Sequence, residues 1–439
     1  MKYKKYLEYK DSGIEWFNEI PQKWELKRLK YSTKGCLNGA WGDEPQENSN
    51  DIICVRVADF NRDKLIIKDN NFTFRNLPKE KRVKLMLSKG DLIIEKSGGG
   101  DNQPVGFVVQ YNHDYPAITS NFVAKIPPNN VNSNYFKYFH SYLYSIRLNI
   151  RSIKQTTGIQ NLDAESYFNE KAIYPPIKEQ ELIANFLDKE TSRLDGLIYK
   201  NKRLIELLKE KRQGLINRAL TKGIDKSAKL KSSGIDWIDD VPQHWELKKL
   251  KYEFKIKKDI AGTEGYNILA VTQSGIKIKD ISSNEGQLSM DYSKYQLVNV
   301  DDYVMNHMDL LTGYVDCSQY VGVTSPDYRV FYLINKNNNK SYFKNMFQIC
   351  YKNKIFYGLG QGVSNFGRWR LQSDKFLNFV IPIPPTKEQE QIACYIDKKS
   401  KDIDTLLSKV EQQIEKLKEY KQTLISNAVT GKIDVRDCA

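Results

Sequence analysis

The sequence predicts an α+β protein with two tandem lobes of mixed helix and strand, separated by two long helices that form a coiled-coil pair. Three observations predict this fold. Two blocks of sequence occur twice, a helical pattern of apolar residues follows each Pro-Pro pair, and short apolar runs divided by Gly, Asn and Asp fill the stretches between them. With 439 residues, 40% hydrophobic and 28% charged, the chain is long enough for two to four domains that each bury a core.

The internal repeat organises the chain. Residues 12–31, SGIEWFNEIPQKWELKRLKY, match residues 233–252, SGIDWIDDVPQHWELKKLKY, at 13 of 20 positions and an offset of 221. Residues 175–190, PPIKEQELIANFLDKE, align with residues 384–399, PPTKEQEQIACYIDKK, at an offset of 209. Two ordered blocks at nearly equal offsets indicate two copies of one unit. The repeated blocks are interpreted as framework, and the variable stretches between them as recognition regions.

The repeat predicts five segments along the chain. They are a first lobe over 1–174, a first helix over 175–222, a second lobe over 223–383, a second helix over 384–430, and a C-terminal tail over 431–439.

Each helix begins after a Pro-Pro pair and repeats apolar residues at the 3.5-residue spacing of a coiled coil. Thr386 and Gln389 can form a capping box, and Gly223 and Gly431 follow the helix ends. The first helix leads into the second lobe and the second helix starts where that lobe ends, so we expect antiparallel pairing. The predicted seams hold Leu187, Leu194, Leu197, Leu204, Leu208 and Leu215 in the first helix, and Ile396, Ile403, Leu406, Val410, Leu417, Tyr420 and Leu424 in the second.

The lobes combine strand and helix signals in the same order. Short apolar runs bounded by turn residues predict strands, and aromatic residues at helical spacing predict one helix in each lobe. In the first lobe the strand runs are 51–60, 64–69, 90–100, 105–112 and 118–126, followed by a helix within 133–150. In the second lobe they are 266–275, 301–309 and 320–333, followed by a helix within 341–356.

Composition narrows the class of protein. The 68 Lys and Arg against 54 Asp and Glu give a net charge of +14, spread over both halves, which favours a polyanionic partner such as nucleic acid, although solubility alone explains such a charge equally well. Six cysteines without a CxxC pair indicate reduced thiols in a cytoplasmic protein. No run approaches the roughly 18 apolar residues of a membrane span.

Each candidate catalytic, cofactor or metal motif in the sequence is better explained by local structure. Ser97-Gly98-Gly99-Gly100 lacks the GxxxxGK[ST] pattern of a phosphate loop, and the glycines fit a hairpin tip. His307 and Asp309 have no further metal ligand at suitable spacing. We therefore expect a chain that binds rather than catalyses.

The residues suited to binding a nucleic acid lie in polar loops beside the repeated framework blocks. Arg, Lys, Asn, Gln, Ser and Thr are the residue types that read base edges or contact phosphates. Any polar turn has a similar composition, so these residues are candidates. The candidate DNA-binding residues are Lys96, Ser97, Asn102, Gln103, Lys154, Gln155, Thr156, Gln160, Asn161, Asn306, His307, Gln361, Ser364, Asn365, Arg368 and Arg370.

The order of these blocks resembles the specificity (S) subunit of type I restriction–modification systems. The resemblance covers essentially the whole chain and rests on the doubled SGI[ED]W…P..WELK[RK]LKY and PP.KEQE blocks, with EKSGGG at 95–100 and TSNF at 119–122. It implies that each lobe is a target recognition domain for one half of a bipartite, asymmetric DNA site. The helices would be conserved spacers that set the gap between the two halves.

The resemblance also implies the partners. Such subunits bind two modification (methyltransferase) subunits and two restriction subunits, an ATP-dependent translocase and nuclease, and S-adenosylmethionine, ATP and Mg²⁺ belong to those partners. Two alternatives stay open. An autonomous methyltransferase or nuclease would act on DNA unaided, and a coiled-coil scaffold for two protein ligands would bind no duplex at any salt concentration.

Overall fold

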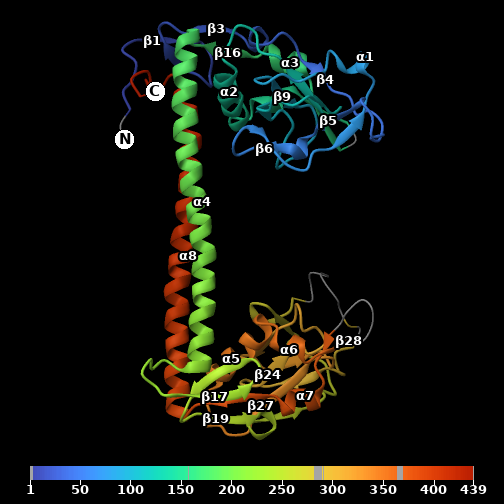
Figure 1. Ribbon diagram of the computed structural model, residues 1–439, viewed down its shortest axis with the longest axis vertical. Helices are drawn as coiled ribbons and strands as arrows, with labels where there is room; N and C mark the ends of the chain where they lie inside the picture. Colours follow the sequence, from blue (N-terminus) through green and yellow to red (C-terminus); the bar gives the residue numbers. More distant parts are fainter. Residues whose placement is uncertain (1–2, 157, 281–288, 290, 363–368, 439) are drawn as a thin grey trace. The chain divides into compact units, whose positions relative to one another are not determined.

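The computed structural model describes residues 3–156, 158–280, 289, 291–362 and 369–438, without the side chains of Thr156 and Gly362. The chain forms two compact units (Figure 1). The first comprises Met1–Lys202 and Gln412–Ala439, and the second comprises Arg203–Glu411. Each unit therefore holds one lobe together with part of both long helices.

The first unit is built around three sheets. The largest has six strands in the order β4 (Leu37–Asn38), β13 (Val123–Ile126), β9 (Leu92–Glu95), β11 (Val108–Gln110), β7 (Ile66–Ile67) and β6 (Phe60–Asn61), antiparallel except for β11 beside β7. The second has the order β12 (Ala117–Thr119), β5 (Asp51–Val55) and β8 (Phe74–Asn76), and the third has the order β10 (Ser97–Gly98), β15 (Ile159–Leu162) and β14 (Ile153–Thr156).

Shorter elements complete this unit. They are β1 (Tyr9–Asp11) paired with β2 (Glu19–Pro21), β3 (Glu25–Arg28) paired with β16 (Lys171–Tyr174), and the helical segments η1 (Leu29–Ser32), η2 (Val57–Asp59), α1 (Lys79–Arg82), α2 (Ser133–Ser145), η3 (Leu148–Ser152) and α3 (Ala164–Asn169).

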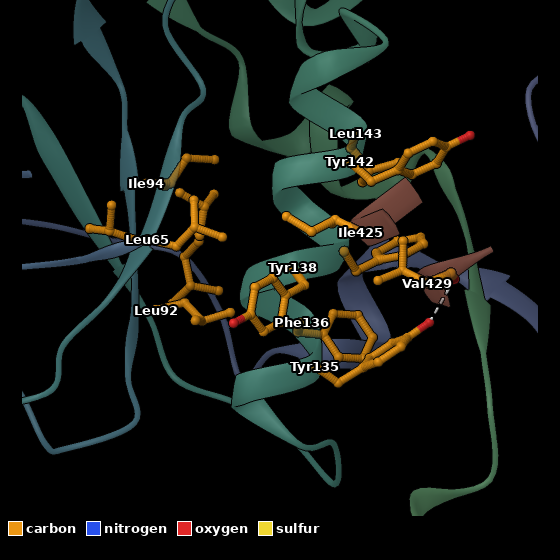
Figure 2. Packing of buried hydrophobic residues seen from close by; sticks show 14 of the residues in the cluster. Leu65, Leu92, Ile94, Tyr135, Phe136, Tyr138, Tyr142, Leu143, Ile425 and Val429 are labelled. Atoms are coloured by element: carbon orange, nitrogen blue, oxygen red, sulfur yellow. Dashed lines mark hydrogen bonds between the residues drawn. The ribbon is translucent and has the colours of Figure 1, made fainter. Parts of the chain in front are cut away.

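Helix α2 supplies the centre of the first core. Asn132 caps its start by accepting a hydrogen bond from the Tyr135 backbone N–H, and Arg147, with a left-handed backbone, follows its end. Figure 2 shows its aromatic side chains between Leu92 and Ile94 on the sheet side and Ile425 of α8 on the other. Burying each side chain of this size stabilises the fold by about 1.5–3 kcal/mol.

The second unit repeats this plan with different sheets. Its main sheet has the order β20 (Phe254–Lys257), β27 (Arg329–Leu333), β24 (Tyr303–Met305) and β25 (Val315–Cys317). Further strand pairs accompany it: β17 (Leu230–Ile235) with β18 (Ile238–Pro242), β21 (Leu269–Thr272) with β22 (Gly275–Ile278), β23 (Gln296–Val298) with β26 (Gly322–Thr324), and β28 (Gln361–Gly362) with β29 (Trp369–Arg370). The remaining elements are β19 (Glu246–Lys249) paired with β30 (Val380–Ile383), η4 (Leu250–Tyr252), α5 (Lys340–Lys352), α6 (Ile355–Gly358) and α7 (Ser373–Asn378).

The long helices α4 (Ile177–Lys222) and α8 (Thr386–Val429) pack together antiparallel in each unit. In the first unit, Leu187 near the start of α4 shares a core with Ile425 near the end of α8. In the second unit, Leu220 at the end of α4 shares a core with Ile392 at the start of α8. The predicted fold class, with two α+β lobes and an antiparallel helix pair, is confirmed.

The predicted seam is only partly right. Leu187 and Leu194 are buried, but the side chains of Leu197, Leu204, Leu406 and Tyr420 are 37%, 42%, 47% and 39% exposed. On α8, Leu407 is buried in place of Leu406. The strict 3.5-residue repeat caused this error, because a helix with 3.6 residues per turn shifts its buried stripe by about 20° per heptad.

Contacts between the repeated blocks explain why they occur twice. The indole Nε1 of Trp24 donates to Glu179 at 3.1 Å, and that of Trp245 donates to Glu388 at 3.0 Å. The blocks WELK and KEQE thus meet in each unit, and their contact joins the start of β3 or β19 to the start of α4 or α8. The next residues repeat the pattern, since Gln180 and Gln389 each accept a hydrogen bond at 2.9 Å from the backbone N–H of the cap residue of α2 or α5.

Candidate nucleic-acid interface

Two candidate segments of the first lobe, 96–103 and 154–161, come together in one small sheet. Strand β15 lies between β10 and β14, and its Asn161 pairs with Ser97 on one side and Lys154 on the other. Residues directly opposite in a ladder share a face, and residues two apart along a strand do as well. Ser97, Lys154, Asn161 and Ile159 therefore line one face of the sheet.

This face is polar and accessible. The Ser97 hydroxyl donates to the Asn161 side-chain oxygen at 2.6 Å. Lys96, which precedes β10, donates from its Nζ to Asn38 Oδ1 at 2.9 Å. Lys154 is 75% exposed and forms an ion pair with Asp163 at 2.6 Å. The hydrogen bond from Lys154 is the main cause of a lowered Asp163 pKa. Exposed ion pairs of this kind contribute little to stability, so the Lys154 ammonium is free to exchange partners.

The opposite face of the small sheet is closed by the lobe. Gln160 is only 6% exposed, and its side-chain oxygen accepts a hydrogen bond at 3.3 Å from the Val105 backbone N–H. Gln155, its neighbour in the ladder, lies at the exposed edge. Thr156 pairs with Ile159 through the backbone. Asn102 and Gln103 are exposed in a tight turn that Gly100 and Gln103 close with two backbone hydrogen bonds of 3.1 and 3.0 Å.

In the second lobe, the end of β24 meets the β28–β29 hairpin. Gln361 and Arg370 face one another at the base of the hairpin, and both are exposed. The backbone N–H of Leu371 donates to the His307 carbonyl at 2.9 Å, which joins the hairpin to the segment of Asn306 and His307. Ser364, Asn365 and Arg368 lie outside the described residues.

His307 and Asn306 differ in accessibility. His307 is 7% exposed, and burial, reinforced by Arg329 and Arg370, lowers its pKa to about 3, so its imidazole is neutral near pH 7. Asn306 is half-buried and lines a cavity of about 360 Å³ whose walls include Tyr292, Tyr295 and Tyr328.

Sequence reasoning missed two residues of these regions. Arg329 lies 4% exposed in the middle of the second lobe, and its one visible signal was an arginine inside the apolar strand run YRVFYL. Ile159 is 51% exposed beside Asn161, and the polar loop pattern gave no reason to select an apolar residue.

Within the described ranges, no three His, Cys, Asp or Glu side chains come together as metal ligands would. Among the helices that the structure describes, none has the length and apolar character needed to cross a bilayer.

Comparison with known proteins gives a consistent family. A family model described as the type I restriction modification DNA specificity domain matches residues 38–207 and, a second time, residues 244–416. The chain is 25% identical over 319 residues to the type I restriction enzyme MjaVIII specificity subunit of Methanocaldococcus jannaschii, covering 67% of this chain and 70% of that protein. It is 24% identical over 438 residues to the putative MjaX specificity subunit of the same organism, covering 95% of each.

Solved structures show the same fold. The HsdS subunit from Thermoanaerobacter tengcongensis aligns with a TM-score of 0.56 at 13% identity, covering 94% of this chain and 98% of that chain. A chain from a structural study of type I R-M complex assembly aligns with a TM-score of 0.66 at 12% identity, covering 93% and 98%. The two matches to the family model span most of the sequence, one in each lobe. The chain therefore belongs to the type I restriction–modification DNA specificity family, as a specificity subunit with two recognition domains and no catalytic role of its own.

Proposed function

We propose that each lobe of this chain reads one half of a bipartite, asymmetric DNA site and that the α4–α8 pair sets the spacer between the halves. The observation that carries this proposal is the exposed ladder of Ser97, Lys154 and Asn161. It gathers candidate base-reading side chains from segments more than fifty residues apart onto one accessible face. In the second lobe, the base of the β28–β29 hairpin places the candidate residues Gln361 and Arg370 opposite one another.

The partners follow from the same family. We infer that the chain docks two modification subunits and two restriction subunits, which would bring S-adenosylmethionine, ATP and Mg²⁺. The repeated framework supports two corresponding docking positions, because a tryptophan–glutamate hydrogen bond, Trp24–Glu179 or Trp245–Glu388, fixes the start of the long helix in each unit. We also infer a cytoplasmic location, since its DNA target lies there and its six cysteines are unpaired.

A methylation map of the host genome tests the proposal. Deletion of the gene, in cells that express the modification subunit, is expected to remove methylation from one bipartite motif and leave all other motifs unchanged. A restored gene carrying Asn161→Ala should weaken or relax only one half of that motif, because Asn161 belongs to one lobe.

Asn70→Ala is the matched control, since Asn70 is an exposed asparagine of the same lobe outside the ladder. A map that deletion leaves unchanged would contradict the proposed function. A map that Asn161→Ala and Asn70→Ala affect equally would contradict the assignment of the ladder.

A further inference from the structure

The second lobe buries an arginine that has no acidic partner. Arg329 is 4% exposed, and no carboxylate lies within 4.0 Å of its guanidinium in the part of the chain that the structure describes. Its Nη2 donates to the Leu371 carbonyl at 2.8 Å and to Ser373 Oγ at 3.3 Å, and its Cζ lies 4.8 Å from the centre of the Phe376 ring. These contacts satisfy hydrogen bonds but leave the positive charge uncompensated, and burying an unpaired charge is unfavourable.

A second arginine, Arg370, directly precedes Leu371, the residue whose carbonyl binds Arg329. Leu371 uses both backbone groups here, donating to the His307 carbonyl and accepting from Arg329. Arg370 precedes it in β29, opposite Gln361, and is exposed without an ion pair to any described residue. Side chains alternate along a strand, so Leu371 points into the core and Arg370 points outward. Arg370 and burial together lower the pKa of Arg329 to about 10, with burial the larger cause.

His307 completes the cluster without adding charge. Its backbone is tied to Leu371, its side chain is 7% exposed, and its Nδ1 has no hydrogen-bond partner among the described residues. With a pKa of about 3 it is neutral near pH 7. The region therefore holds two positive charges, one buried and one exposed, and an unused imidazole nitrogen. An anion at this position would supply the missing negative charge.

We propose that the base of the β28–β29 hairpin binds one phosphate of the DNA backbone, with the Arg370 guanidinium as the contact and Arg329 as a buried positive charge behind it. The inference rests on the proposed DNA-binding function and assigns Arg370 to positioning on the DNA backbone rather than to base reading. A phosphate fits because arginine binds it through paired hydrogen bonds and because a nearby buried charge acts through a low dielectric. Asn306 and Gln361 beside it remain the candidates for base contacts.

The salt dependence of binding tests this site. The full chain is titrated with a mixed-sequence duplex of about 30 base pairs, and the dissociation constant is measured by fluorescence anisotropy at several salt concentrations. Each neutralised phosphate contributes about 0.9 to the slope of log K against log salt. Arg370→Gln is expected to reduce the slope by about 0.9 and to weaken binding to every duplex by a similar factor. Arg370→Lys, which keeps the charge, is expected to retain the slope.

Lys416→Gln is the matched control, because Lys416 is an exposed cation on α8 outside both candidate interfaces. Arg329→Met should weaken binding while keeping the wild-type slope, since the direct contact through Arg370 remains. A wild-type chain that binds duplex with a normal salt slope, shared by Arg370→Gln, would overturn the phosphate site and leave the DNA-binding function intact. A wild-type chain that binds no duplex would overturn the DNA-binding function itself.

Discussion

Replacing Glu179 by Ala should destabilise the first unit more than the equivalent replacement, Glu388→Ala, destabilises the second. Glu179 is 8% exposed, and its Oε1 accepts hydrogen bonds from the Tyr6 hydroxyl at 2.5 Å and from Trp24 Nε1 at 3.1 Å. Tyr6 and Trp24 are 8% and 0% exposed, so water does not replace the lost acceptor. Each buried donor left without an acceptor lowers the free energy of unfolding by about 1–3 kcal/mol, which gives about 2–6 kcal/mol for Tyr6 and Trp24 together.

Glu388 makes the corresponding contacts in a more solvent-exposed environment. Its Oε2 accepts from Trp245 Nε1 at 3.0 Å and lies 2.8 Å from Nε2 of His244, whose side chain is 52% exposed. After Glu388→Ala, the exposed His244 side chain can hydrogen-bond to water instead, so only the Trp245 indole N–H loses its partner. The expected loss is therefore about 1–3 kcal/mol, half that of the first unit.

Hydrogen exchange read by mass spectrometry separates the two units, because peptides from α2 report on the first and peptides from α5 on the second. Glu179→Ala is expected to raise exchange in α2 and to leave α5 near the wild-type rate. Glu179→Gln serves as the control, since its amide oxygen still accepts hydrogen bonds. Equal losses for Glu179→Ala and Glu388→Ala, or a larger loss for Glu388→Ala, would refute the argument from burial.

Two further predictions concern spacing and pH. Inserting seven residues into both α4 and α8 adds about 10 Å of helix, which equals about three base pairs at about 3.4 Å each. The spacer of the methylated motif should lengthen by that amount while both half-sites stay unchanged. An unaltered spacer would disprove the proposal that the helix pair sets the spacer length. Burial lowers the pKa of His140 to about 3, below the value of about 6.5 in an unfolded chain, so the unfolded state binds the extra proton in this window. The first unit should lose about 1.4 kcal/mol per pH unit as the pH falls below about 6.5. Urea midpoints should show a shallower loss for His140→Gln, and identical pH profiles would contradict this assignment.

The sequence predicted the plan of the fold because the repeat carries it. The paired blocks predicted two similar units, and the structure places the same cap, Asn132 or Asn339, at the start of the central helix of each lobe. The bond from Trp24 to Glu179 was not predictable from either block alone, since it joins residues 155 positions apart. Repetition showed that these residues share a role, and only the folded chain shows that they contact each other.

The sequence predicted which polar segments belong to the candidate interface, but it did not predict how those segments pair in space. Polar segments 96–103 and 154–161 were selected separately, and nothing in either segment predicts that Asn161 pairs with Ser97 and Lys154. Strand pairing over such distances depends on the register that the rest of the lobe imposes. Gln160 illustrates the limit, because its neighbours in the sequence are exposed while its own side chain is buried.

The differences between the two lobes matter as much as their shared framework. The first lobe presents a three-stranded ladder whose exposed face carries a serine, a lysine, an asparagine and an apolar isoleucine. The second presents a two-stranded hairpin base with a glutamine and an arginine, backed by the buried charge of Arg329. Corresponding Trp–Glu junctions, Trp24–Glu179 and Trp245–Glu388, hold these unlike surfaces, so the framework is shared while the chemistry of the surfaces differs. Two lobes of this kind are expected to read two different half-sites, and the asymmetry of the DNA site follows from the side chains rather than from the arrangement of the units.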